Sequence, residues 1–316
     1  MKTVNIRSTF SKLVFTLTLI LAFVSCTSKP EKKSLIFRDY PQIKLGFNTF
    51  NFLNALPLDV PGLTEVIEYA ASEGFSFVEI RDQFVDLNSD DCKALAEVAR
   101  GNGLELIYVF NKNLLDPEFG EFFNKALANA MTLPGPGILR ALASKTEMEA
   151  DPQKKGWTDD ELSKMCRIAD SCAAVCKSKN ITFVFENNNE AFFGDSLNYH
   201  GLADLFSCTS GPGLQLDIAN MYRKSARVTP DPAKILAYLP SLGSRWVETH
   251  LKSSPGGEPL DYLSDNPLQV KEIIELMGKQ NVKYAAIELT ALKDKQDCKD
   301  NLKKSIRFLR DQELLK

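Results

Sequence analysis

Short apolar segments alternate with longer amphipathic segments from residue 43 onward, and this alternation constrains the fold more than any other feature of the sequence. The expected strands are Ile43–Thr49, Phe75–Ile80, Leu104–Phe110, Ile138–Leu142, Ile181–Glu186, Leu214–Asp217, Trp246–Leu251 and Tyr284–Leu289. The expected helices, in which apolar residues recur at helical spacing, are Leu63–Ser72, Asp91–Arg100, Phe119–Met131, Asp159–Lys177, Leu197–Phe206, Ala233–Leu239, Leu268–Lys279 and Cys298–Gln312.

Eight strands, each followed by a helix, within about 270 residues predict an α/β fold, a single (β/α)8 TIM barrel. The apolar character of the strand segments agrees with strands that are buried on both faces. A doubly wound sheet is the alternative, but no glycine-rich dinucleotide-binding motif follows the first strand.

The first 26 residues differ from the rest of the chain. Basic residues (Lys2, Arg7, Lys12) precede an apolar run of 12 residues, 13–24, and a bilayer-spanning helix needs about 20. The run therefore predicts a signal peptide, residues 1–25. It ends in Phe-Val-Ser-Cys, which resembles a bacterial lipobox, so we expect lipidation of Cys26. Ordinary signal cleavage beside an incidental cysteine is the alternative.

A polar segment that contains proline, residues 26–41, follows the apolar run and predicts a tether to a barrel domain at 42–316. The expected location is the bacterial cell envelope, and the expected partner there is the membrane, through a lipid on Cys26. An oxidising compartment permits disulfides among the other six cysteines. Cys166, Cys172 and Cys176 nevertheless share one apolar stripe of an expected helix, which favours buried, unpaired cysteines.

Charge and histidine content exclude two classes of function. Lys and Arg number 38 against 41 Asp and Glu, and a net charge of −3 gives no electrostatic footprint for nucleic acid. His200 and His250 are the only two histidines, so a metal site built from several imidazoles is excluded. His200 lies in the helix expected after the fifth strand, where we predict a surface or packing role.

Four consecutive strands each end with a residue that can bind a metal. Strands five to eight end in Glu186, Asp217, His250 and Glu288. The carboxyl ends of barrel strands form one rim, so these side chains should meet there. Crowded carboxylates repel each other, and a divalent cation relieves that repulsion. Three carboxylates and one imidazole predict one divalent ion: Mn²⁺, Mg²⁺, Co²⁺ or Zn²⁺.

The segments FVEIRD, FVFENNNE, LQLDIANM, ETHLKSS and AAIEL, in this order, resemble the xylose-isomerase-like TIM-barrel superfamily of sugar isomerases and epimerases. The resemblance implies that the four strand-end residues bind one divalent metal, and that Glu186 and Glu288 also move protons on opposite faces of a sugar. It further implies substrate contacts by Glu79, Asn220 and Lys252. A structural role beside the site is the alternative for Glu79, and a surface salt bridge is the alternative for Lys252. Epimerases often carry a histidine where this chain has Asn220.

The function predicted from these residues is a metal-dependent sugar isomerase or epimerase that acts through an enediolate. Removing a proton beside a carbonyl leaves negative charge that a metal can stabilise, and a second carboxylate returns the proton to the other face. Export, and the absence of an Arg/Lys cluster near the expected site, predict an unphosphorylated sugar or keto-sugar as the small carbohydrate substrate.

Two further functions remain open. One is a 3-keto-glycoside lyase or hydratase, in which the same proton removal ends in β-elimination. The other is a non-catalytic carbohydrate-binding lipoprotein.

Overall fold

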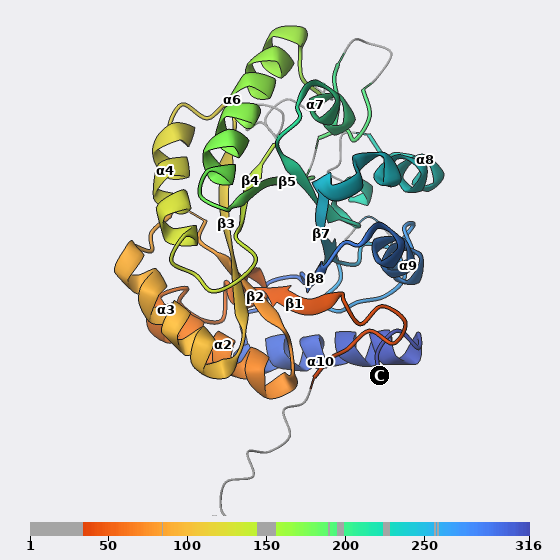
Figure 1. Ribbon diagram of the computed structural model, residues 1–316. Helices are drawn as coiled ribbons and strands as arrows, with labels where there is room; N and C mark the ends of the chain where they lie inside the picture. Colours follow the sequence, from red (N-terminus) through yellow and green to blue (C-terminus); the bar gives the residue numbers. More distant parts are fainter. Residues whose placement is uncertain are drawn as a thin grey trace, which may run out of the picture. The chain divides into compact units, whose positions relative to one another are not determined.

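Eight parallel strands close into a barrel in which each strand pairs with its neighbours in chain order (Figure 1). The computed structural model describes residues 34–83, 85–143, 156–188, 190–194, 199–223, 228–255, 257 and 259–316, and these belong to one unit, Ser34–Lys316. The strands are β1 (Lys44–Asn48), β2 (Phe77–Arg81), β3 (Glu105–Asn113), β4 (Ile138–Leu142), β5 (Thr182–Glu186), β6 (Gly213–Asp217), β7 (Trp246–Leu251) and β8 (Tyr284–Ile287).

Helices follow the strands and surround the barrel (Figure 1). They are α2 (Val60–Glu73), α3 (Ser89–Asn102), α4 (Phe119–Ala130), α6 (Asp159–Lys177), α7 (Leu202–Cys208), α8 (Pro232–Tyr238), α9 (Val270–Gln280) and α10 (Lys295–Asp311), with short 3-10 helices η1 (Thr49–Phe52), η2 (Asn220–Tyr222) and η3 (Leu239–Arg245). The single (β/α)8 barrel predicted from the alternation of segments is confirmed.

Local sequence signals set most helix ends. The side chain of Asn88 accepts hydrogen bonds at the start of α3, and Gly103 ends that helix with a φ of 66°, a left-handed conformation that suits glycine. Helix α7 begins at Leu202 and not at the expected residue 197. His200 exchanges backbone hydrogen bonds with Trp157, at 2.8 and 3.0 Å, which holds it in an extended conformation before the helix.

The barrel interior is filled by an apolar layer with a polar layer above it. The apolar layer consists of Phe77, Ile107, Val109, Ile138, Val184, Tyr284 and Ala286. Gly46 of β1 makes room for the Phe77 ring, because a Cβ at this position would lie 2.5 Å from it. Toward the carboxyl ends of the strands the buried interior residues become polar, among them Asn48, Gln215 and Glu248. The apolar layer therefore closes the barrel beneath a polar site.

The described part of the segment expected to be a tether, from Ser34, belongs to the barrel. Leu35 and Phe37 are buried, and Phe37 pairs with Leu315. The backbone N–H of Lys316 donates to the carbonyl of Ile36 at 3.0 Å. The boundary predicted at residue 42 is therefore corrected to residue 34, because these apolar side chains bury area against the barrel. The expected signal peptide and Cys26 lie outside the described residues.

A disulfide between Cys166 and Cys208 joins α6 to α7, with a Cα–Cα distance of 6.0 Å. The prediction that Cys166 is an unpaired packing residue is therefore wrong. Cys172 and Cys176 on the same helix are buried and free, as predicted. The spacing of apolar residues predicts which face of a helix is buried. It does not predict that a cysteine of another helix, here Cys208, lies against that face.

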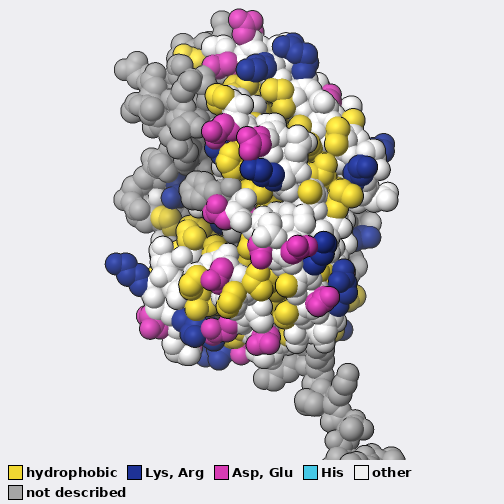
Figure 2. Space-filling view, turned by 90° about the vertical axis from the view of Figure 1, so that its left-hand side faces the viewer, with side chains coloured by type: hydrophobic (Ala, Val, Ile, Leu, Met, Phe, Trp, Pro, Cys, Tyr) yellow, Lys and Arg dark blue, Asp and Glu magenta, His cyan; other side chains and the backbone are white. Residues whose placement is uncertain are grey.

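Side chains of both charges are interspersed with hydrophobic ones on the face of the molecule drawn in Figure 2. Within the described residues, helices long and apolar enough to cross a bilayer are absent.

Candidate active site

The four side chains predicted as metal ligands meet at the carboxyl end of the barrel. Glu186 and Asp217 end β5 and β6, His250 is the next-to-last residue of β7, and Glu288 directly follows β8. One ligand atom of each residue lies within 4.8 Å of those of the others, and all four residues are buried. Asp217 and His250 are paired in the register of β6 and β7, so the sheet itself places them side by side.

Three atoms of this quartet are buried polar atoms that could bind a metal ion. Asp217 Oδ2, His250 Nδ1 and Glu288 Oε2 are buried and have no hydrogen-bond partner among the described residues. Such buried unpaired polar atoms are uncommon in folded proteins. His250 Nδ1 lies 3.2 Å from Glu186 Oε1 and 3.3 Å from Glu288 Oε2. Three carboxylates and one imidazole nitrogen fit a divalent cation, so the residues present suit the predicted ion.

Glu79 orients His250 from below the quartet. Its Oε2 lies 2.7 Å from His250 Nε2, which leaves Nδ1 facing the other ligands. Asn48 Nδ2 and Gln215 Nε2 donate to the same carboxylate at 2.9 and 2.5 Å. Glu79 is fully buried. This contact with a predicted metal ligand agrees with the structural role that the sequence left open for Glu79, and its predicted contact with substrate stays a prediction.

Glu248 lies in the same polar layer, where Gln215 Nε2 donates to its Oε2 at 2.8 Å. Burial and the neighbouring Glu79 raise the pKa of Glu248 well above its usual value.

Two asparagines fix the ligands of β5 and β6. Asn187 Nδ2 donates to the carbonyl of Asp217 at 2.9 Å, and the Asp217 N–H donates back to Asn187 Oδ1 at 2.8 Å. Asn220 donates from its backbone to Asp217 Oδ1 at 2.8 Å and from Nδ2 toward Glu186 Oε1 at 3.4 Å. Asn220 Oδ1 is buried without a partner among the described residues. Asn220 thus supports the ligands and keeps an acceptor for another molecule.

Two buried cations neutralise part of the quartet. Lys252 Nζ lies 2.6 Å from Glu288 Oε1 and 3.4 Å from Asp217 Oδ2, and Arg140 Nη2 lies 3.2 Å from Glu186 Oε2. Burial alone would raise the pKa values of Glu186 and Glu288, but Arg140 and His250 lower that of Glu186, and Lys252 and His250 lower that of Glu288. Asp217 has a raised pKa, because burial outweighs the effect of Lys252. Both expected proton-transfer residues are therefore ionised at neutral pH.

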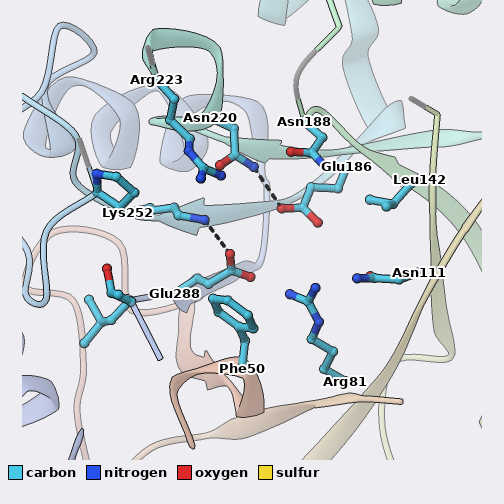
Figure 3. Close-up of a pocket in the computed structure, with 13 residues that line it drawn as sticks. Phe50, Arg81, Asn111, Leu142, Glu186, Asn188, Asn220, Arg223, Lys252 and Glu288 are labelled. Atoms are coloured by element: carbon cyan, nitrogen blue, oxygen red, sulfur yellow. Dashed lines mark hydrogen bonds and ion pairs between the residues drawn. The ribbon is translucent and has the colours of Figure 1, made fainter. Parts of the chain in front are cut away.

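A pocket of about 200 Å³ opens above the quartet (Figure 3). Its lining residues come from several strand ends and loops: Phe50, Arg81, Asn111, Leu142, Glu186, Asn188, Asn220, Arg223, Lys252, Pro259, Glu288, Leu289 and Thr290. The two expected acid–base residues and two of the three expected substrate-binding residues are among them. His200 lies elsewhere, 2.6 Å from Asp159 of α6, in agreement with the predicted surface role.

The sequence did not indicate the arginines around this site. Arg81 ends β2, Arg140 lies in the middle of β4, and Arg223 follows η2, so the expectation of few cations near the site is wrong. Two features of the sequence could have indicated Arg81 and Arg140. Arg81 shares strand parity with Glu79, and an arginine within the apolar strand ILRAL must find a buried acidic or polar partner.

Solved structures with the same fold include several sugar epimerases. The chain superposes on D-allulose 3-epimerase from Methylomonas sp. with a TM-score of 0.64 and 14% identity, over 88% of this chain and 99% of that one. It superposes on a sugar phosphate isomerase/epimerase from Parabacteroides distasonis with a TM-score of 0.60 and 15% identity, over 85% and 96%.

A third such structure is D-psicose 3-epimerase from Clostridium cellulolyticum with D-tagatose, with a TM-score of 0.60 and 14% identity, over 84% of this chain and 99% of that one. No protein-family model and no curated protein matches the chain. The structural neighbours confirm the resemblance to xylose-isomerase-like sugar isomerase and epimerase barrels at the level of the fold.

Proposed function

We propose that this protein is a metal-dependent isomerase or epimerase of an unphosphorylated sugar or keto-sugar, and that it acts through an enediolate. The observation that carries the proposal is that Glu186 and Glu288, from β5 and β8, line one pocket beside a buried quartet that suits a divalent ion. When bound, the ion would polarise the substrate carbonyl and stabilise the enediolate. Structural neighbours named as epimerases of D-allulose and D-psicose support the reaction class.

The two carboxylates have different neighbours, which suggests different roles. Glu186 is ionised beside Arg140 and can accept a proton from the carbon next to the carbonyl. Glu288 accepts a hydrogen bond of 2.6 Å from the Lys252 ammonium, so Lys252 is the nearest source of the proton that Glu288 must return on the other side of the substrate. Epimerisation needs this pairing of one base with one proton donor.

Deuterium exchange tests the proposal. The protein, reconstituted with Mn²⁺, is incubated in D₂O with a panel of ketoses and 3-keto-sugars, with and without EDTA. We expect deuterium at the carbon beside the carbonyl of a turned-over sugar, and loss of exchange with EDTA. No exchange with any sugar that binds would overturn the enzyme and leave a carbohydrate-binding protein. Release of an alcohol from a 3-keto-glycoside would assign the lyase reaction.

Two kinds of variant separate proton transfer from metal binding. E186Q and E288Q keep the size of the side chain but remove the basic carboxylate, so each should lower the exchange rate by about 10²–10⁴-fold. D217N should act mainly through the ion, so excess Mn²⁺ should partly restore its activity. Full activity of E186Q at saturating Mn²⁺ would contradict the base assigned to Glu186.

A further inference from the structure

The basic groups of the pocket differ in whether they have a partner. Arg140 and Lys252 form ion pairs with Glu186, Glu288 and Asp217. Arg81 and Arg223 also line the pocket, but neither lies within 4 Å of a carboxylate of the described residues. Figure 3 shows their guanidinium groups entering the pocket from opposite sides. Within the described residues, two positive charges therefore face the pocket without a carboxylate at ion-pair distance.

Arg81 is held by contacts with neighbouring residues of the barrel. Its guanidinium carbon lies 4.3 Å from the centre of the Phe50 ring, a stacking geometry that fixes the plane of the fork. Its backbone N–H donates to Thr49 Oγ1 at 2.8 Å. Its Nε is buried and has no hydrogen-bond partner among the described residues. A buried charged donor without an acceptor is costly, and a ligand acceptor would satisfy it.

The surroundings of Arg81 select an anionic ligand group. Asn111 also lines the pocket, and its Oδ1 accepts a hydrogen bond of 2.8 Å from Arg140 Nη1. The amide of Asn111 is therefore left with its NH₂ donors for the pocket. Figure 3 shows Asn111 and Arg81 on the same side of the pocket. A guanidinium fork with an amide donor beside it binds an oxygen anion, and a carboxylate matches the fork with two parallel hydrogen bonds.

A divalent ion strengthens this preference. Arg140 and Lys252 already offset two of the three carboxylate charges of the quartet, so a divalent ion would bring more positive charge than the one remaining negative charge can match. A negatively charged substrate supplies the missing counter-charge. A neutral sugar would leave the ion, Arg81 and Arg223 to repel each other across a small buried pocket.

We infer that Arg81, stacked on Phe50 with Asn111 beside it, binds a carboxylate of the substrate, so that the substrate is an acidic sugar of the uronate class. The inference rests on the proposed function, because the reacting carbons must lie at Glu186 and Glu288 while the carboxylate lies at Arg81. A phosphate is less favoured. Phosphates in TIM barrels often bind to the loops after strands seven and eight. Here the pocket lining after these strands consists of Lys252, which is paired with Asp217 and Glu288, of Glu288 itself, and of Pro259, Leu289 and Thr290.

Calorimetric titration with matched ligands tests the inference without using turnover. The protein, reconstituted with Mn²⁺, is titrated with three hexuronates (D-glucuronate, D-galacturonate and D-mannuronate) and with the parent hexose of each. We expect at least one acid to bind about 10- to 100-fold more tightly than its parent sugar, the gain typical of hydrogen bonds to charged groups. Equal affinity within all three pairs would overturn the carboxylate subsite.

Variants locate the subsite within the pocket. R81Q should abolish the preference for the acid, and R81K should keep part of it, because lysine retains the charge but lacks the fork. R223Q removes the same charge from the opposite side of the pocket and is the matched control, so it should preserve most of the preference. An equal loss in R223Q and R81Q would show a general charge effect and overturn the assignment. If R81Q fails to fold, F50L removes the stacking and should weaken binding of the acid alone.

One further ligand distinguishes a carboxylate subsite from a phosphate subsite. The calorimetry and the deuterium exchange together distinguish a failure of this inference from a failure of the proposed function. D-glucose 6-phosphate should bind more weakly than the preferred hexuronate, and the reverse order would replace the carboxylate with a phosphate. If deuterium exchange fails while R81Q still abolishes the preference for the acid, the subsite stands and the catalytic proposal falls. If exchange succeeds only with neutral ketoses, the catalytic proposal stands and the subsite falls.

Discussion

At the scale of single residues, the contact of Glu79 with His250 decides which imidazole nitrogen faces the quartet. Carboxylate partners of metal-binding histidines contribute about 10- to 100-fold to metal affinity. E79Q keeps the size of the side chain but replaces the charged acceptor of His250 Nε2. We expect E79Q to bind Mn²⁺ about 10- to 100-fold more weakly in a competition titration with a chelator.

E105Q is the control for that experiment. Glu105 is also a barrel glutamate, but it pairs with Lys44 at the opposite end of the barrel, at 2.6 Å, so its substitution should leave Mn²⁺ affinity unchanged. If E79Q instead keeps its metal affinity and raises the KM for sugar, Glu79 contacts the substrate directly.

The residues of the site divide into those that strand position predicts and those that it does not. Glu186, Asp217, His250 and Glu288 were predicted because each lies at the end of an apolar segment, and a barrel brings those ends together. The role of Arg140 depends on its ion pair with a neighbouring strand. A single sequence does not contain that pairing, so only the burial of Arg140 was foreseeable.

At the scale of elements, the disulfide between Cys166 and Cys208 is the covalent link between α6 and α7. It closes a loop with a sequence separation of 42 residues, and a disulfide typically contributes about 2–4 kcal/mol of stability. We expect C166S/C208S to lose about this amount in denaturant unfolding. Reductant should destabilise the wild type to the same extent and leave the double variant unchanged. Equal stability of the oxidised wild type and the double variant would contradict a stabilising bridge.

His200 connects the start of α6 to the start of α7 through Asp159 and Asp204, at 2.6 and 3.5 Å. The hydrogen bond to Asp159 raises the pKa of His200, against a smaller effect of burial. The folded state therefore binds this proton more tightly than the unfolded state, where the pKa is about 6.5. The stabilisation is fully present below about pH 6.5 and is lost as the pH rises through the raised value.

We accordingly expect the wild type to have its largest Tm advantage over H200Q in acid, and the two Tm values to converge as the pH rises from about 5 to about 9. The comparison removes the contribution of His250, which both proteins contain. D159N should reproduce the profile of H200Q. A Tm difference that is constant across this range would show that His200 contributes through packing rather than charge.

The same region shows why strands were easier to predict than one of the helices. Strands β4 and β7 have the predicted bounds: Gly137 precedes the apolar run of β4, and Arg245 and Lys252 flank that of β7. The start of α7 was predicted five residues too early, since its preceding segment has helical periodicity. Backbone pairing of His200 with Trp157, 43 positions away in the chain, overrides that local preference.

At the scale of the whole molecule, the barrel domain includes residues 34–41, which composition assigned to a tether. The run Leu35-Ile36-Phe37 is short and lies beside charged residues, so its composition did not separate it from a polar tether. The structure buries Leu35 and Phe37 against the barrel and pairs the segment with residues 314–316. The distance in sequence between Cys26 and the first barrel residue, Ser34, is therefore short.

The barrel does not determine whether the protein is held at a membrane. We propose that a lipid on Cys26 anchors it there. The proposal rests on the basic residues, the apolar run of 12 residues and the Ser25-Cys26 junction. Expressed in a bacterium that processes lipoproteins, the full chain should fractionate with membranes and partition into the detergent phase. C26A should lose the lipid and leave the detergent phase, while C92A, which changes a buried barrel cysteine, should remain with the membrane. Mass spectrometry of the N-terminal peptide should show a diacylated Cys26 in the wild type. A C26A protein that still partitions wholly into detergent would show that the apolar run or another contact, and not a lipid, holds this protein at the membrane.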